Sequence, residues 1–242
     1  MPNWCYNSTA IHGDHETLTK FVDAITVKDG ITVHGDEIAT DGRDKYDLTL
    51  LHPVPEELRI RSVFFSTDTD DPEHLELTKQ YEANIAKYGH RDWYDWSIEN
   101  WGTKWSPHID DDEIDIYEGR IVSFSYDTAW SPPTALLRKI SEIFPTLLIT
   151  NTFDEEGMGF WGCEAFHGGK EVSSYGMSDG EMPEVFADKR KAIEERYNSD
   201  DEDERWEAHG DLMDVGLEMK EHCEEVVYLE LRRAGLLPSP VI

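Results

Sequence analysis

The chain has 242 residues and a formal net charge of −30, because 52 Asp and Glu outnumber 22 Lys and Arg. Such a charge opposes binding to nucleic acids and to anionic membranes, and this excludes direct nucleic-acid binding as an expected function. No apolar run has the length of a membrane span, and the first residues lack a signal-peptide pattern, so we expect a soluble, cytoplasmic protein.

Hydrophobic periodicity divides the chain into strands and helices. The first half is predicted to contain a strand, a helix, a short strand, a second main strand, a helix and an aromatic segment, over residues 4–12, 16–27, 31–34, 46–51, 71–88 and 93–105. The second half is predicted to contain a strand, a helix, two hairpin strands and two helices, over residues 120–130, 131–144, 147–153, 158–166, 181–197 and 204–234.

This order predicts an α+β protein with a ferredoxin-like antiparallel sheet of the split βαβ type. We expect the ferredoxin-like domain over residues 1–168, with a helical and aromatic insertion at about residues 56–118. Residues 169–242 are expected to form an acidic helical extension built from a helical pair.

Three stretches of the chain are centred on tryptophan: MPNWCYN at residues 1–7, NWGTKW at residues 100–105 and DTAWSPP at residues 127–133. In this order they resemble the motifs of a family of phage- and plasmid-borne proteins of uncharacterised function. The resemblance runs from residue 1 to about residue 168. It implies a ferredoxin-like fold and a mobile-element setting, and it implies no particular activity.

We expect the three stretches to form one shared, partly polar cluster, because a buried indole N–H group needs a hydrogen-bond partner. One interpretation is a pocket for a small molecule such as a nucleotide, in which Lys104 meets a phosphate. The alternative is a rigid corner of the core, in which the indole groups bond backbone carbonyls. The candidate ligand-binding residues are Trp4, Asn7, Asn100, Trp101, Thr103, Lys104, Trp130 and Ser131.

The predicted C-terminal helices carry 18 acidic and 6 basic residues between positions 181 and 230. We expect them to bind a host protein with a basic surface, and a homodimer through these helices is left open. Reversing the charges of residues 200–203 to Lys is expected to abolish partner binding and to leave thermal unfolding nearly unchanged. The candidate partner-binding residues are Glu194, Glu195, Asp200, Asp201, Glu202, Asp203, Glu204, Glu207, Asp211 and Asp214.

The sequence predicts no catalytic residues, no cofactor and no metal site. The acidic runs at residues 110–115 and 200–205 lack the glycine that a calcium loop of the EF-hand type requires. Cys5, Cys163 and Cys223 are odd in number and widely spaced, which argues against a disulfide framework.

These observations favour a non-enzymatic mobile-element protein that inhibits a host defence or nucleic-acid-binding protein through an acidic, DNA-mimicking surface. The first alternative is a nucleotide-binding protein, a sponge for a signal molecule, that uses the tryptophan cluster. The second is a metal-dependent hydrolase, whose catalytic residues cannot be named from the sequence.

Overall fold

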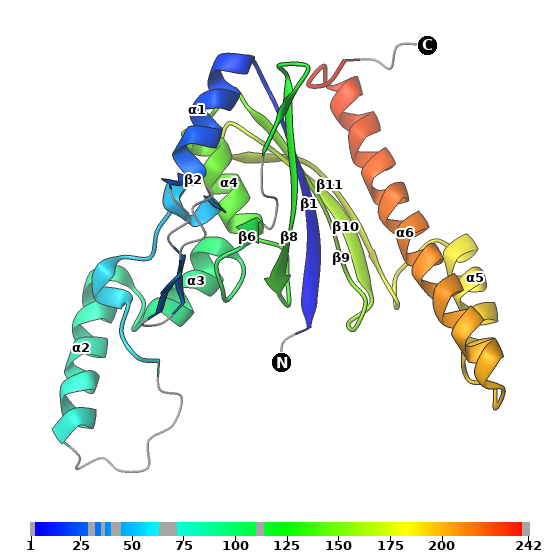
Figure 1. The fold of residues 1–242 in the computed structure, drawn as a ribbon, viewed down its shortest axis with the longest axis horizontal. Helices are drawn as coiled ribbons and strands as arrows, with labels where there is room; N and C mark the ends of the chain where they lie inside the picture. Colours follow the sequence, from blue (N-terminus) through cyan, green and yellow to red (C-terminus); the bar gives the residue numbers. More distant parts are fainter. Residues whose placement is uncertain are drawn as a thin grey trace.

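The computed structural model describes residues 3–28, 32–34, 37–39, 45–62, 72–109 and 114–238. Its main sheet has six antiparallel strands in the order β11-β10-β9-β1-β8-β7 (Figure 1). In chain order these strands are β1 (Trp4–His12), β7 (Ile116–Tyr117), β8 (Ile121–Ala129), β9 (Leu148–Glu155), β10 (Phe160–His167) and β11 (Lys170–Ser178). The two small sheets contain β2 (Thr26–Val27) with β5 (Lys45–Asp47) and β6 (His108–Ile109), and β3 (Thr32–His34) with β4 (Glu37–Ala39).

Four neighbouring strands, β9-β1-β8-β7, form the ferredoxin-like part of the sheet. The chain passes from β1 to β7 with β8 lying between them, and from β8 to β9 with β1 lying between them. These are two split βαβ units, so the predicted α+β, ferredoxin-like fold is confirmed. Strands β10 and β11 extend the sheet beyond β9, and β11 was not predicted from the sequence.

The second main strand was predicted at residues 46–51, and this prediction was wrong. The side chain of Asp47 accepts hydrogen bonds from the backbone N–H and the hydroxyl of Thr49, at 2.8 and 2.7 Å. This cap turns the chain into the 3-10 helix η2 (Leu48–Leu51), so that only the short β5 remains extended and it pairs outside the main sheet. The place in the main sheet is taken by β7, which pairs with the start of β8.

Helices α1 (His15–Ile25) and α4 (Thr134–Ile143) cover one face of the sheet (Figure 1). Helix α1 begins after Asp14, whose carboxylate accepts a hydrogen bond from the Thr17 N–H at 3.0 Å. The first hydrophobic core lies between this face and the helices, and it includes Leu18, Phe21, Ile25, Val122, Phe124, Leu136, Ile140, Ile149 and Phe166. Helices α2 (Pro72–Tyr88) and α3 (Trp93–Trp101) and the 3-10 helix η3 (Glu56–Leu58) fill the connection between α1 and β7.

Helix α6 (Glu202–Arg233) crosses the opposite face over β9, β10 and β11, and α5 (Glu184–Tyr197) packs beside its first half (Figure 1). These two helices confirm the predicted helical pair. A second hydrophobic core lies beneath α6 and includes Trp161, Cys163, Ala165, Met177, Val215, Met219, Cys223, Val227 and Leu231. None of the described helices has the length and apolar character needed to cross a membrane.

Candidate binding surfaces

The structure brings the three tryptophan-centred stretches together at one end of β1 and β8. The hydroxyl of Thr103 donates to the carbonyl of Ala129 at 3.2 Å and accepts from its N–H at 3.1 Å, which fixes the loop after α3 to the edge of β8. The Ser131 hydroxyl donates to the Gly102 carbonyl at 2.7 Å. The backbone N–H of Trp130 donates to the Asn3 carbonyl at 3.0 Å.

Gly102 makes this close approach feasible. It ends α3 in the left-handed conformation, with a φ of 87°, and a Cβ atom at this position would lie 3.1 Å from the carbonyl oxygen of Pro132. The glycine of the NWGTKW motif is therefore required both by its own backbone conformation and by the neighbouring turn.

Three tryptophans at this junction lie at the surface. Trp4, Trp105 and Trp130 expose 52%, 37% and 36% of their area, whereas Trp96 and Trp101 are buried in the first core. The ring centroid of Trp105 lies 5.8 Å from that of Trp4 and 6.4 Å from that of Trp130, and the last pair is stacked with an interplanar angle of 24°. Together with Lys104 they form a continuous surface that we call the tryptophan platform.

Lys104 lies over the rings of the platform. Its Nζ atom is 4.4 Å from the ring centroid of Trp105, 5.4 Å from that of Trp130 and 5.5 Å from that of Tyr94. Cation–π attraction holds the ammonium group over these ring faces. Within the described part of the chain, no carboxylate forms an ion pair with Lys104, although the protein carries a large excess of acidic residues.

Trp130 has an unusual backbone conformation. Its φ is 69°, in the left-handed region that bulky side chains avoid because their Cβ approaches the following carbonyl. Such a conformation costs on the order of 1–2 kcal/mol and persists only where its surroundings enforce it. The hydrogen bond to Asn3 and the Ser131–Gly102 hydrogen bond enforce it on either side of the residue.

Four other candidate ligand-binding residues are buried or half-buried, and their side chains do not reach the platform surface. Trp101 is buried, and its indole N–H donates to the His52 carbonyl at 2.8 Å. Asn100 is half-buried and donates to the Trp96 carbonyl at 3.0 Å. The side chain of Thr103 is fully buried, and that of Ser131 is committed to Gly102. Of the eight candidates, only Trp4, Lys104 and Trp130 present side chains at the platform surface, where Trp105 joins them.

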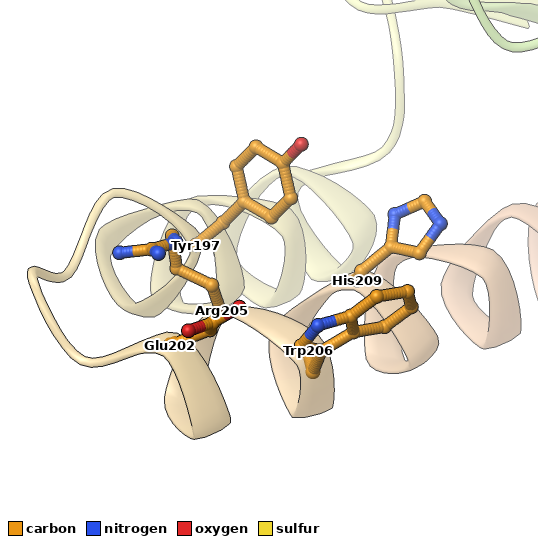
Figure 2. Close-up of a pocket in the computed structure, with 5 residues that line it drawn as sticks. All are labelled: Tyr197, Glu202, Arg205, Trp206 and His209. Carbon is orange, nitrogen blue, oxygen red and sulfur yellow. The ribbon is translucent and has the colours of Figure 1, made fainter.

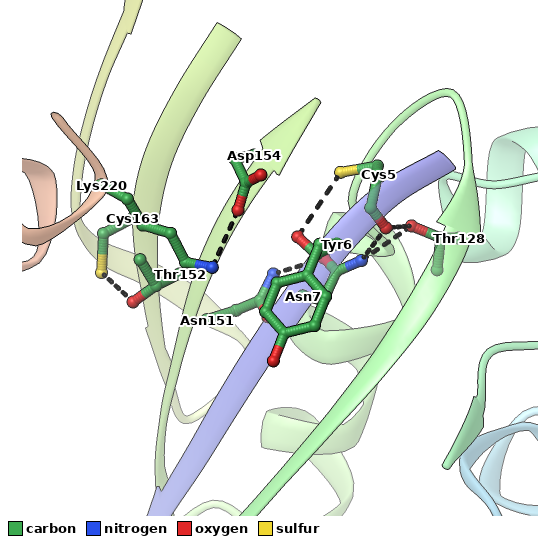
Figure 3. A network of polar contacts seen from close by, with 9 residues as sticks. All are labelled: Cys5, Tyr6, Asn7, Thr128, Asn151, Thr152, Asp154, Cys163 and Lys220. Carbon is green, nitrogen blue, oxygen red and sulfur yellow. Dashed lines mark hydrogen bonds and ion pairs between the residues drawn. The ribbon is translucent and has the colours of Figure 1, made fainter. Parts of the chain in front are cut away.

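The remaining candidate, Asn7, belongs to a buried polar network on the α4 side of the sheet (Figure 3). Its amide nitrogen donates to the Thr128 hydroxyl at 2.8 Å, and its amide oxygen accepts from Asn151 at 3.1 Å. Thr9 donates to the amide oxygen of Asn151 at 2.8 Å and contacts the Tyr126 hydroxyl at 2.9 Å. These side chains satisfy one another, so the network positions the strands and leaves Asn7 inaccessible.

Glu164 extends this network toward α4. Its carboxyl group accepts hydrogen bonds from Thr134 at 2.8 Å and from Asn151 at 3.4 Å. Burial raises the pKa of Glu164 to about 7, because the two hydrogen bonds only partly offset the loss of water. Glu164 could not be recognised from the sequence, because both faces of β10 are buried and the strand shows no alternation that marks a buried polar position.

Contacts on the other side of the sheet connect it to α6 (Figure 3). Lys220 donates to the carboxylate of Asp154 at 2.8 Å, and its Nζ atom lies 4.1 Å from the ring centroid of Tyr6. The Thr152 hydroxyl contacts the Cys163 sulfur at 3.6 Å. Lys220 is thus engaged with the sheet, which leaves the outward side of this part of α6 more acidic.

The candidate partner-binding residues lie on and between α5 and α6. Eight of the ten are exposed, and Glu204 and Asp211 are half-buried. Asp211 pairs with Arg196 at 2.6 Å, and Glu194 pairs with Arg190 at 3.4 Å. Asp201 is the N-cap of α6, because its carboxylate accepts from the N–H groups of residues 203 and 204 at 3.0 and 3.3 Å.

Helix α6 exposes a row of large apolar side chains that, from their helical spacing, the sequence predicts to pack together with Cys223, Val227 and Leu231, but only these last three are buried. Trp206, Met213 and Leu217 expose 69%, 52% and 54% of their area, and their spacing of seven and four residues places them on one side of the helix. We call this row the apolar stripe. Each member is followed in the chain by an exposed acid, and these three acids together with the exposed Glu221 form a parallel acid ridge beside the stripe, made of Glu207, Asp214, Glu218 and Glu221.

A cavity of about 270 Å³ opens at the start of α6 beside the apolar stripe (Figure 2). It is lined by Tyr197, Glu202, Arg205, Trp206 and His209. A second cavity of about 220 Å³ shares Tyr197 and His209 with the first and reaches Trp161 between α5 and α6. The volumes suit single side chains better than drug-sized ligands, which occupy about 300–1,000 Å³.

Comparisons with known proteins found a family model that matches part of the chain and a solved structure that is similar to it. Residues 100–211 match the family model described as the ferredoxin-like domain in Api92-like protein. Among solved structures, the chain is similar to the crystal structure of protein Api92 from Yersinia pseudotuberculosis, with 11% sequence identity and a TM-score of 0.40, over 76% of this chain and 100% of that chain. No curated protein matches the sequence.

Proposed function

We propose that this protein is a non-enzymatic binding protein that captures a host protein with a basic surface through α6. In this proposal the ferredoxin-like sheet is the scaffold, and the apolar stripe and the acid ridge are the contact surface. The partner is a nucleic-acid-binding or defence protein of the host cytoplasm, which the complex inhibits by covering a basic cleft. The mobile-element setting belongs to the same proposal.

The arrangement of the stripe and the ridge is the observation that carries this proposal. Exposed apolar side chains in a continuous row favour burial against a partner, and aromatic residues such as Trp206 are enriched among residues that dominate binding energy. The ridge beside them attracts Lys and Arg mainly through Asp214 and Glu221, because Glu207 and Glu218 form ion pairs with Arg196 and Lys189 of α5. The 270 Å³ cavity, whose wall holds two aromatic rings together with Glu202 and Arg205, fits a single side chain of the partner as an anchor.

The overall charge density argues for a local contact and against mimicry of a DNA rod by the whole molecule. A net charge of −30 over 14,415 Å² is about one charge per 480 Å². Double-stranded DNA, treated as a cylinder of ~10 Å radius with one charge per ~1.7 Å, carries about one per 100 Å². The proposed mimicry is therefore restricted to the acid ridge and its immediate surroundings.

The experiment compares charge reversal on the ridge with an equal reversal elsewhere. The ridge variant carries Glu207→Lys, Asp214→Lys and Glu221→Lys. The matched control reverses three other exposed acids, Asp23, Glu82 and Asp115, and changes the formal charge by the same amount. We expect the ridge variant to lose about tenfold or more in affinity for a partner captured from host lysate, and the control to retain most of it. Equal losses in both variants would show that only net charge matters and would refute the α6 surface.

The apolar stripe gives an independent test. A Trp206→Ser, Met213→Ser, Leu217→Ser variant removes exposed side chains, so its thermal unfolding should stay close to that of the wild type. Its binding should fall at all salt concentrations, whereas the loss in the ridge variant should be largest at low salt. Unchanged binding by the stripe variant would contradict the proposed contact.

The reversal of Asp200, Asp201, Glu202 and Asp203 is a poorer test than the sequence indicated. Loss of the Asp201 N-cap costs about 0.5–2 kcal/mol, and lysines in the first turn oppose the helix dipole. The expectation of unchanged thermal unfolding for that variant therefore does not hold, because reduced binding would be mixed with destabilisation of α6.

A further inference from the structure

The tryptophan platform is separate from the proposed partner surface, and its geometry points to a ligand of its own. Trp4, Trp105 and Trp130 come from three distant parts of the chain and expose ring area that the fold leaves uncovered. Three neighbouring exposed indoles favour burial against a ligand, because this removes their apolar area from water.

The platform is also held rigidly. The hydrogen bonds from Thr103 to Ala129 and from Ser131 to Gly102 fix its two loops to each other. Trp130 keeps its ring in place at the expense of a left-handed backbone that glycine would adopt without strain. A turn with this φ does not require a tryptophan for folding. The strain at Trp130 therefore points to a role of the indole ring itself.

We infer that the tryptophan platform binds a planar aromatic anion, of which a nucleoside monophosphate is the simplest biological example. Exposed indole faces stack on heterocyclic bases, and each stack contributes to affinity without a need for base-specific hydrogen bonds. Lys104, whose ammonium lies over the rings of Trp105 and Trp130, supplies the matching positive charge, and no carboxylate of the described residues forms an ion pair with it.

Two competing ligand classes fit less well. A free organic cation would be repelled by Lys104, whose ammonium lies over the rings of Tyr94, Trp105 and Trp130, whereas an anion pairs with it. A nucleic-acid strand would place many phosphates in the field of a protein with a net charge of −30. A single phosphate beside Lys104 avoids most of this repulsion, because charges beyond about 8 Å are screened at physiological salt.

The test follows the indole N–H signals of the eight tryptophans by NMR during titration of the full chain with adenosine 5′-monophosphate. We expect the signals of Trp4, Trp105 and Trp130 to shift together, and those of the buried Trp101 and Trp161 to remain unchanged. Adenosine and inorganic phosphate are titrated separately, and each should bind more weakly than the monophosphate.

Two variants assign the roles of ring and charge. Trp105→Ala should weaken the monophosphate by about fivefold or more, as expected for loss of one stacking partner. Lys104→Met should weaken the monophosphate and leave adenosine unchanged. Tyr117→Ala, which removes a ring that is 66% exposed in β7, outside the platform and the α6 surface, is the control and should bind normally.

Several results would overturn the inference. They are an absence of shifts at the platform, adenosine binding as tightly as its monophosphate, equal shifts with inorganic phosphate alone, or normal binding by Lys104→Met. Trp130→Gly keeps the test decisive if Trp105→Ala does not fold, because glycine suits the backbone at this position. Monophosphate binding by that variant with wild-type affinity would also contradict the inference.

Discussion

Replacement of Trp130 by glycine and by alanine separates the function of the ring from its backbone strain. Both variants lose the same ring contacts, so their difference reports the left-handed conformation, whose φ is 69°. Alanine keeps a strain of about 1–2 kcal/mol, and glycine relieves it but gains unfolded-state freedom worth about 0.4–1 kcal/mol. The glycine variant should therefore be more stable than the alanine variant by roughly 0.5–1 kcal/mol.

The assay is urea unfolding followed by far-UV circular dichroism, with the slope m compared between the variants. The same pair of substitutions at Ser123, an exposed position within β8, is the control. There glycine should be the less stable variant, because it loses more conformational freedom in a strand. If Trp130→Ala equals or exceeds Trp130→Gly in stability, the residue is not strained, and the strain argument for the platform fails.

Three further predictions concern Glu164, the three cysteines and Gly102. In the folded protein Glu164 keeps a proton that the unfolded chain releases above about pH 4.5, so its contribution to stability is lost as the pH rises toward its folded pKa of about 7. Urea unfolding of Glu164→Gln should show its stability relative to wild type rising by about 3 kcal/mol over this range, and a pH-independent difference would contradict the raised pKa. Burial raises the pKa of Cys5, Cys163 and Cys223 to about 12, so a thiol reagent at pH 8 should label none in the native state and three after unfolding. Gly102→Ala should lower the free energy of unfolding by about 1–3 kcal/mol through its positive φ and its clash with the neighbouring turn, and unchanged thermal unfolding would refute this role.

The sequence predicted those elements whose signals are local. The alternation along residues 4–12, the Asp14 cap and the prolines after β8 each give an unambiguous local preference, and the structure contains β1, α1 and α4 at these positions. The strand predicted at residues 46–51 failed because a single side-chain cap at Asp47 overrides the preference of the residues after it. Strand β11 was missed because its exposed, Ser-containing edge resembles a loop.

The surfaces were harder to predict than the fold. Trp101 and Trp105 occur in one motif, but Trp101 lies in the last turn of α3 and is buried, whereas Trp105 follows the Gly102 turn and is exposed. The position of Gly102 between the two tryptophans could have indicated that one lies in the helix and the other after it. The sequence could not show that the polar residues Asn7 and Asn151 face α4, because alternation separates the two faces of a strand without saying which helix covers each face.

The two hydrophobic cores share strands but no residues, and this separation affects how the protein can evolve. Strand β9 contributes Ile149 to one core and Leu148 to the other, and β10 likewise contributes Phe166 and Ala165. Helices α5 and α6 can therefore accumulate substitutions, or be exchanged for another helical pair, while the core that supports the tryptophan platform keeps its packing. One ancestral sheet could acquire new binding specificities on its α6 side without a change in its other half.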